Sequence, residues 1–279
     1  MARFGYDMLP TWSHWQIERY LSLDDQQRAI TSRHIDDLHR WHRRAQLPVY
    51  VEFLGQVEER MRVAAPPAAV AQPDAALVSA WRGRIGEAWT PVAERLAPGL
   101  AELALTLRPE QIERLRKRLE DADATYREKF LPDKAPDRIQ ARGDRVVKRA
   151  EFFLGSLEGA QERELRQLAA ALPATEEIWL AERQHRNRTL LALLQRIARE
   201  KPAQAQAERL TREYLLGMWT PADARRRERI EAGIAASDAL AVQMLARATP
   251  TQRSHLVRTL RGYADDFRSL AGTALAANR

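Results

Sequence analysis

Apolar residues recur every three or four positions along most of this chain, the spacing that places them on one face of an α-helix. Two long runs show it most clearly: Ile112, Leu115, Leu119, Ala122, Tyr126 and Phe130, and Leu256, Leu260, Tyr263, Phe267, Leu270 and Ala274. A third run comprises Ile139, Val146, Ala150, Phe153, Leu157 and Ala160. No segment alternates apolar and polar residues convincingly with the period of a β-strand, and β-branched residues are sparse. The sequence therefore predicts an all-α fold.

Proline residues divide this pattern into about 10 or 11 helices. The helices are expected near residues 8–20, 24–45, 49–63, 75–89, 91–105, 109–130, 137–170, 175–200, 203–217, 221–246 and 250–275. Pro48 is expected to separate the second helix from the third. The Pro/Ala-rich segment 64–74 is expected to link an N-terminal helical segment, 1–63, to a helical bundle, 75–279. Because several helices exceed 20 residues, we expect one continuous, elongated bundle overall.

Capping signals mark the beginnings of several of these helices. Residues 249–252, Thr-Pro-Thr-Gln, combine an N-cap hydroxyl, a proline at the first helical position and a glutamine at the third. Residues 24–27, Asp-Asp-Gln-Gln, follow the same pattern. The glutamine can return a hydrogen bond to the N-cap amide, so capping is sufficient to explain these motifs.

The charge balance bears on the choice of partner. The formal net charge is +7, which is typical of proteins that bind nucleic acid or an anionic membrane surface. However, acidic residues are interspersed through almost every expected helix, which favours a solvated surface of mixed charge and no specific nucleic-acid partner. The apolar runs are far shorter than the roughly 18–20 residues that cross a bilayer. The lack of cysteine excludes disulfides, thiol catalysis and thiolate metal sites.

Three segments together carry a resemblance to known proteins. Residues 41–50 read W-H-R-R-A-Q-L-P-V-Y, residues 23–27 read L-D-D-Q-Q, and residues 107–111 read L-R-P-E-Q. This combination resembles a family of uncharacterised bacterial lipoproteins of proteobacterial type, over roughly residues 4–200. The spacing of leucine and glutamine is also weakly similar to the L-T-x-x-Q motif of small periplasmic chaperones and metal-stress proteins.

The lipoprotein resemblance implies a location. Such a protein is periplasmic and is anchored to the outer membrane by a lipidated N-terminal cysteine, which we expect at or next to the position of Met1. Phe4, Tyr6, Trp12 and Trp15 would then lie beside the anchor, and amphipathic aromatic residues suit a membrane–water interface. They equally suit a first helix that packs sideways onto the bundle.

Two arginines are the best candidates for a binding site. Arg183 and Arg186 fall within the apolar stripe that runs from Trp179 to Ile197. A buried guanidinium needs either a carboxylate partner or a bound anion. The sequence therefore predicts an ion pair with an acid of a neighbouring helix or, alternatively, a site for an anionic ligand.

His39 and His42 are weak candidates for a metal site. They are three residues apart and share a helix face, but no third ligand of fixed spacing accompanies them, so structural or solvated histidines are the favoured interpretation and no metal is expected. The sequence contains no phosphate-binding glycine loop, zincin motif or nucleophile elbow. We therefore expect neither catalysis nor a cofactor.

The leading hypothesis is an outer-membrane-anchored periplasmic ectodomain. It would act by binding an envelope protein or a membrane surface, as a scaffold or a chaperone-like module. The alternative hypothesis is a cytoplasmic, basic helical protein that binds nucleic acid or an acidic partner through its arginines. The sequence makes no prediction of the oligomeric state.

Overall fold

The structure, a computed structural model, describes residues 2–63, 75–171, 173–219 and 223–276. These residues form helices joined by short connections, with no β-strand among them. The helices are α1 (Ala2–Asp7), α2 (Leu9–Leu21), α3 (Asp25–Trp41), the π-helical turn η1 (His42–Gln46), α4 (Leu47–Val63), α5 (Ala75–Glu87), α6 (Trp89–Thr106), α7 (Pro109–Phe130), α8 (Ala135–Leu154), α9 (Gly159–Ala171), α10 (Glu176–Glu200), α11 (Gln204–Gly217), α12 (Ala224–Ala246) and α13 (Pro250–Ala276). The prediction of an all-α fold is confirmed.

The prediction of several helices longer than 20 residues is also confirmed, since α7, α10, α12 and α13 have 22, 25, 23 and 27 residues. The predicted linker at 64–74 lies outside the described residues. Among the described residues, no helix combines the length and the apolar composition that a membrane span requires.

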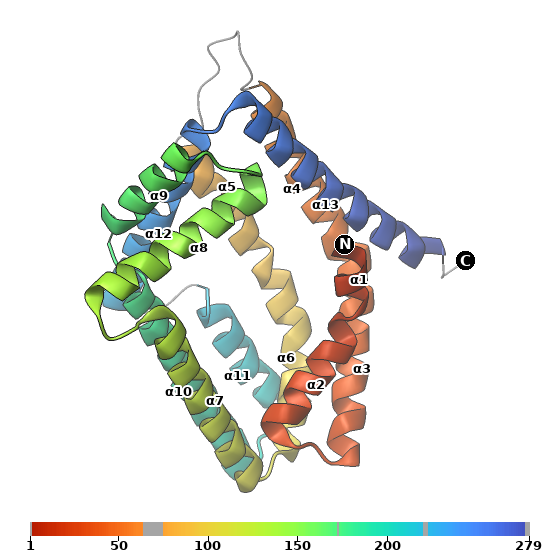
Figure 1. The fold of residues 1–279 in the computed structure, drawn as a ribbon. Coiled ribbons are helices and arrows are strands. Elements are labelled where there is room, and N and C mark those ends of the chain that lie inside the picture. Colours follow the sequence, from red (N-terminus) through yellow and green to blue (C-terminus); the bar gives the residue numbers. More distant parts are fainter. Residues whose placement is uncertain (1, 64–74, 172, 220–222, 277–279) are drawn as a thin grey trace.

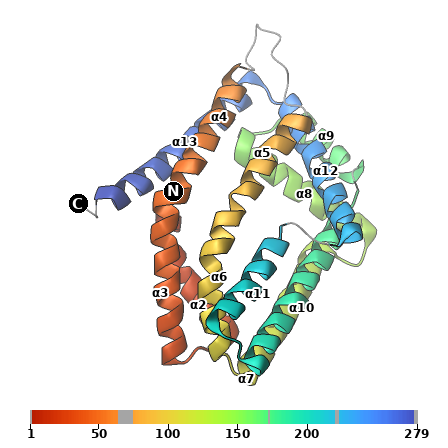
Figure 2. The same ribbon diagram turned by 180° about the vertical axis from the view of Figure 1, so that it is seen from behind.

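The helices are arranged as an open frame (Figure 1). Three pairs of helices lie side by side in both views: α4 with α13, α6 with α11, and α7 with α10 (Figure 2). The pairing of α4 with α13 packs the N-terminal segment against the last helix of the chain.

Small residues allow α6 and α11 to approach closely. Ala93, Ala97 and Ala101 of α6 are spaced one turn apart and are completely buried. The Thr211 hydroxyl of α11 donates a hydrogen bond to the Ala97 carbonyl oxygen across the interface, at 3.0 Å. Because alanine side chains are small, α11 packs closely along this face of α6.

The helix predicted at 137–170 is divided into α8 and α9, so that prediction was wrong at this point. Gly155 has a φ of +80°, and its amide donates to the Glu151 carbonyl oxygen at 2.8 Å, which ends α8. A positive φ favours glycine, which has no Cβ. The apolar spacing continues across this break, which is why the sequence pattern did not reveal it.

Paired glutamines join the ends of four helices at two places. Gln27 and Gln111 are almost fully buried at the beginnings of α3 and α7, and each Oε1 accepts the backbone N–H of the residue three positions earlier. Each Nε2 donates to the Oε1 of the other glutamine, at 3.1 and 2.7 Å. The Nε2 of Gln27 also donates to the Thr106 carbonyl, and that of Gln111 to the Ser22 carbonyl, both at 3.0 Å.

Gln161 and Gln252, near the beginnings of α9 and α13, repeat this arrangement bond for bond. Their amides donate to each other at 3.1 and 2.9 Å, and to the carbonyls of Arg247 and Ser156 at 3.3 and 2.9 Å. In all four cases the accepting carbonyl lies five positions before the partner glutamine. The predicted capping role is confirmed for Gln27 and Gln252, but the glutamines also tie two helix beginnings together, which capping alone does not explain.

Candidate functional site

The helix that follows Asp24 passes through Pro48 without a break, so the predicted separation at this proline was wrong. α3, η1 and α4 form one continuous helical segment, and the Leu47 amide donates to the His42 carbonyl oxygen five residues earlier. In an α-helix, proline clashes with the carbonyl four residues before it and has no N–H to donate. The wider π turn changes the hydrogen-bonding register immediately before Pro48, which lets the helix continue. Single π turns are rare and are frequently found at functional sites.

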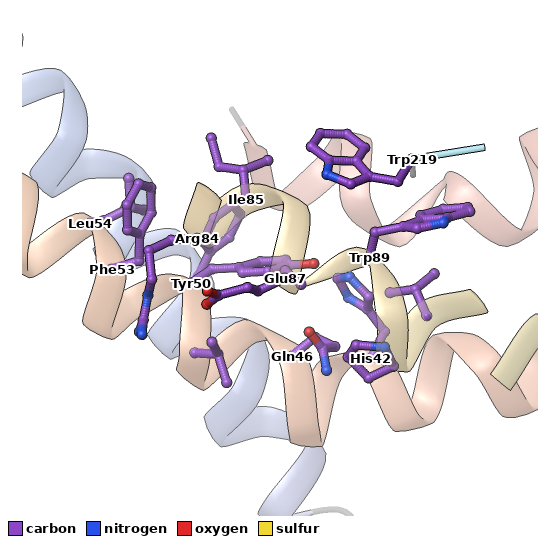
Figure 3. Close-up of a pocket in the computed structure, with 15 residues that line it drawn as sticks. His42, Gln46, Tyr50, Phe53, Leu54, Arg84, Ile85, Glu87, Trp89 and Trp219 are labelled. Atoms are coloured by element: carbon purple, nitrogen blue, oxygen red, sulfur yellow. The ribbon is translucent and has the colours of Figure 1, made fainter. Parts of the chain in front are cut away.

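A cavity of about 710 Å³ lies beside this π turn (Figure 3). Its walls come from η1 and α4 on one side and from the junction of α5 and α6 on the other, with contributions from the end of α11 and from α13. The side chains that define its chemistry are those of His42, Gln46, Tyr50, Glu87, Trp89 and Trp219.

Gln46 is the unusual residue of this cavity. It is only 6% exposed, and its Oε1 atom is fully buried without a hydrogen-bond partner among the described residues. Figure 3 shows its side chain on the η1 side of the cavity, beside that of His42. A buried acceptor with no partner destabilises a fold by about 1–3 kcal/mol, so such an atom requires an explanation.

His42 presents an uncharged imidazole beside Gln46. Its Nδ1 is hydrogen-bonded to the Tyr6 hydroxyl at 2.8 Å, and its ring packs edge-on against Tyr50 at a centroid distance of 5.5 Å. Burial lowers the pKa of His42 to about 4, assisted by the nearby His39. At neutral pH the ring is therefore neutral, and its Nε2 has no hydrogen-bond partner among the described residues.

Two tryptophans close the cavity on the side opposite α4. Trp219 packs over Gly86 at the end of α5, where any Cβ atom would clash with the indole ring. Trp89 is held in place because its Nε1 donates to the Leu215 carbonyl oxygen at 2.8 Å. Gly86 thus allows an aromatic residue from the end of α11 to form part of the wall.

A family model matches residues 19–222, nearly three quarters of the chain. The chain belongs to DUF6279, a family of unknown function. The matched region of this DUF6279 protein includes the π turn, Gln46, Trp89 and Trp219. No curated protein and no solved structure matches the chain.

Arg183 and Arg186, the candidates from the sequence, do not line the cavity beside the π turn. Arg183 donates from Nε to Asp123 Oδ1 of α7 at 2.6 Å, so it has an acid partner on a neighbouring helix. The Nε of Arg186 is buried and has no hydrogen-bond partner among the described residues, while its carbonyl oxygen accepts from the Tyr214 hydroxyl at 3.4 Å. The two arginines therefore differ in their environments although they are neighbours in sequence.

His39 and His42 both pack against Tyr6, with ring-centroid distances of 4.7 and 5.7 Å. Nε2 of His39 lies 3.2 Å from the Tyr6 carbonyl oxygen, and burial lowers the pKa of His39. The described residues contain no group of three or more histidine, cysteine or acidic side chains suited to hold a metal ion.

The four N-terminal aromatic residues fall into two classes. Phe4, Trp12 and Trp15 are 76%, 55% and 55% exposed. Tyr6 is 7% exposed and hydrogen-bonded to His42, so its side chain packs against the π turn, whereas the expectation that all four aromatic residues lie near a membrane stays a prediction. The Tyr6 hydroxyl contacts the π turn through its hydrogen bond to His42.

Sequence reasoning missed the cavity although it singled out residues 41–50. Gln46 and Tyr50 lie within this segment, but the expected break at Pro48 separated them. It also missed the ion pair of Arg226 with Glu182, whose side chains are 11% and 6% exposed. In the sequence, Arg226 is followed by apolar residues at helical spacing, which indicates that it is partly buried. Its partner Glu182 lies 44 residues earlier, so the sequence did not indicate the pairing.

Proposed function

We propose that this DUF6279 protein binds an apolar molecule bearing a hydrogen-bond donor in the cavity beside the π turn, and that its role is binding rather than catalysis. The observation that carries the proposal is the buried, unpartnered Oε1 of Gln46 at this cavity. A rotation of the Gln46 amide would turn this atom into the cavity, where a ligand that donates a hydrogen bond would satisfy it.

The walls of the cavity indicate the rest of the ligand. Tyr50, Phe53, Trp89 and Trp219 give it large aromatic surfaces, and such surfaces bind apolar or planar groups. A ligand without a donor would leave Gln46 buried and unpaired, which costs about 1–3 kcal/mol. We therefore expect the site to distinguish a donor from an acceptor of the same shape.

Two probes of nearly equal shape test this expectation. N-phenyl-1-naphthylamine has one N–H donor, whereas 1-phenoxynaphthalene has an ether oxygen in its place. Binding of each is measured by quenching of tryptophan emission, since Trp89 and Trp219 line the cavity. We expect the amine to bind about tenfold more tightly, equivalent to about 1.4 kcal/mol.

Substitution of the glutamine provides the control. Gln46→Leu keeps the volume of the side chain but removes the acceptor, so both probes should bind with equal affinity. Gln56→Leu makes the same change at an exposed position of α4 and should preserve the preference for the amine. Equal affinities in the wild-type protein, or a preference that persists in Gln46→Leu, would contradict the proposal.

We further propose, from the lipoprotein resemblance, that the protein is lipid-anchored in the periplasm and serves there as a scaffold or chaperone-like module. The exposed residues Phe4, Met8, Trp12 and Trp15, spaced four, four and three apart, support contact with a membrane surface. Incorporation of labelled palmitate into the protein expressed from its complete gene tests the anchor. Unlabelled protein, or sequence-selective nucleic-acid binding that survives about 200 mM salt, would favour the cytoplasmic alternative.

A further inference from the structure

A stripe of four arginines follows one face of α8. Arg138, Arg142, Arg145 and Arg149 are spaced four, three and four residues apart, so they share one face of the helix; the first three are partly buried and Arg149 is exposed. The last three line a second cavity, of about 430 Å³, together with Arg82 of α5. This cavity also receives residues of α7, α10 and α12 and is separate from the one beside the π turn.

Carboxylates balance only part of this charge. Glu176, which is 8% exposed, accepts two hydrogen bonds from Arg142 at 3.0 Å each and one from Arg145 at 2.6 Å. Burial is the largest single influence on Glu176 and opposes its ionisation. The hydrogen bonds from Arg142, a backbone hydrogen bond and the positive charges of Arg142 and Arg145 together outweigh it and hold the pKa of Glu176 below the usual value. One carboxylate therefore serves two guanidinium groups.

The remaining two arginines of the cavity differ from each other. Arg82 is paired with Asp238 of α12. Arg149 has no acid partner among the described residues. Among the described residues, four guanidinium groups thus face two carboxylates, which is an excess of two positive charges at the cavity.

We propose that this cavity binds a phosphate monoester that carries an apolar chain. A phosphate monoester bears a charge of about −1.5 to −2 at neutral pH, which matches the excess of positive charge, and its oxygens fit the planar fork of guanidinium donors. Arg145 is held in position because its guanidinium stacks over the Phe130 ring at 4.9 Å. Trp179, Leu240 and Met244 provide an apolar wall for the chain.

Octyl phosphate is the probe that tests this proposal, and isothermal titration calorimetry is the measurement. We expect one molecule to bind per chain, more tightly than either inorganic phosphate or octanol, because each of these lacks half of the recognised features. The affinity should fall as salt is raised, since charge contributes to binding.

Arg149→Ala is the informative variant, because this arginine has no acid partner whose loss would disturb the fold. We expect it to weaken octyl phosphate binding about tenfold without changing the melting temperature. Arg114→Ala on α7 is the matched control, since Arg114 is exposed and is likewise without an acid partner among the described residues. It should leave the affinity unchanged.

Vesicles distinguish a membrane lipid from a soluble ester as the source of the phosphate. Arg149-dependent cosedimentation with vesicles that contain phosphatidic acid, but not with phosphatidylcholine alone, would identify a lipid headgroup. Arg149-dependent binding of octyl phosphate without cosedimentation would identify a soluble ester. If octyl phosphate fails to bind, or binds equally to the wild type and Arg149→Ala, the proposal is overturned.

Discussion

Acidification should destabilise this protein through His42, and the substitution His42→Gln should remove that part of the effect. His42 lies in the π turn, where burial lowers its pKa from the usual 6.5 to about 4. In the unfolded chain its pKa returns to about 6.5. Between these values the unfolded chain binds the proton and the folded chain does not, so stability must fall as the pH falls through this window.

The magnitude follows from the difference between the two pKa values. A pKa difference of about 2.5, at about 1.4 kcal/mol for each unit, corresponds to a loss of about 3.5 kcal/mol. The ring is partly exposed, so solvent screening reduces the expected loss to about 2 kcal/mol. The loss begins near pH 6.5 and is complete below about pH 4.

Urea unfolding of the wild type and of His42→Gln, at several values between pH 7.5 and about pH 4, measures this contribution. Glutamine can keep a hydrogen bond to Tyr6 but does not titrate. His39 also has a pKa lowered by burial and remains in both proteins, so the difference between the two curves isolates His42. We expect the wild type to lose about 2 kcal/mol more than the variant over this range. Parallel curves would show that His42 is not buried as a neutral ring.

Two further predictions concern the buried polar contacts, and both are tested by urea unfolding. Arg226→Ala should lower the free energy of unfolding by about 3–5 kcal/mol because Glu182 remains buried and unpaired. Arg183→Ala, at a side chain that is 39% exposed, should lower it by about 1 kcal/mol because the buried Asp123 keeps its hydrogen bonds from Asn187. Equal losses would refute this comparison. Gln27→Leu and Gln111→Leu should each lower it by about 1–3 kcal/mol, and the double variant by less than their sum, because each single change leaves one amide without its partner. Strict additivity would show that the two amides act independently.

The helical architecture was predictable from the sequence because each helix carries its own apolar period and, in several cases, its own cap. The caps at Gln27 and Gln252 were predictable because they involve residues three positions apart. Their pairing with Gln111 and Gln161 was not, because it depends on how distant helices meet. The cap at Gln161, where the glutamine accepts the N–H of Glu158, was not predicted because the sequence pattern indicated one uninterrupted helix over residues 137–170.

The candidate site could be predicted only in part, for two physical reasons. A π turn has no characteristic residue, and the proline that follows it favours the opposite prediction, a break. The opposite wall of the cavity depends on the contact between Gly86 and Trp219, which only the tertiary fold creates. The arginine stripe of α8 was visible in the sequence, but the cavity that it lines depends on how distant helices meet.

The two glutamine pairs also show where a function is to be sought. The first pair lies between α2, α3, α6 and α7, and the second lies between α8, α9, α12 and α13. Both pairs make the same hydrogen bonds, so a shared arrangement of helices explains the glutamine pairs. Among the described residues, the π turn η1 has no counterpart beside the second glutamine pair. The helix arrangement that surrounds both glutamine pairs therefore does not require the π turn. The ligand proposed for the cavity would give the buried, unpartnered Oε1 of Gln46 the hydrogen-bond donor that the described residues do not supply.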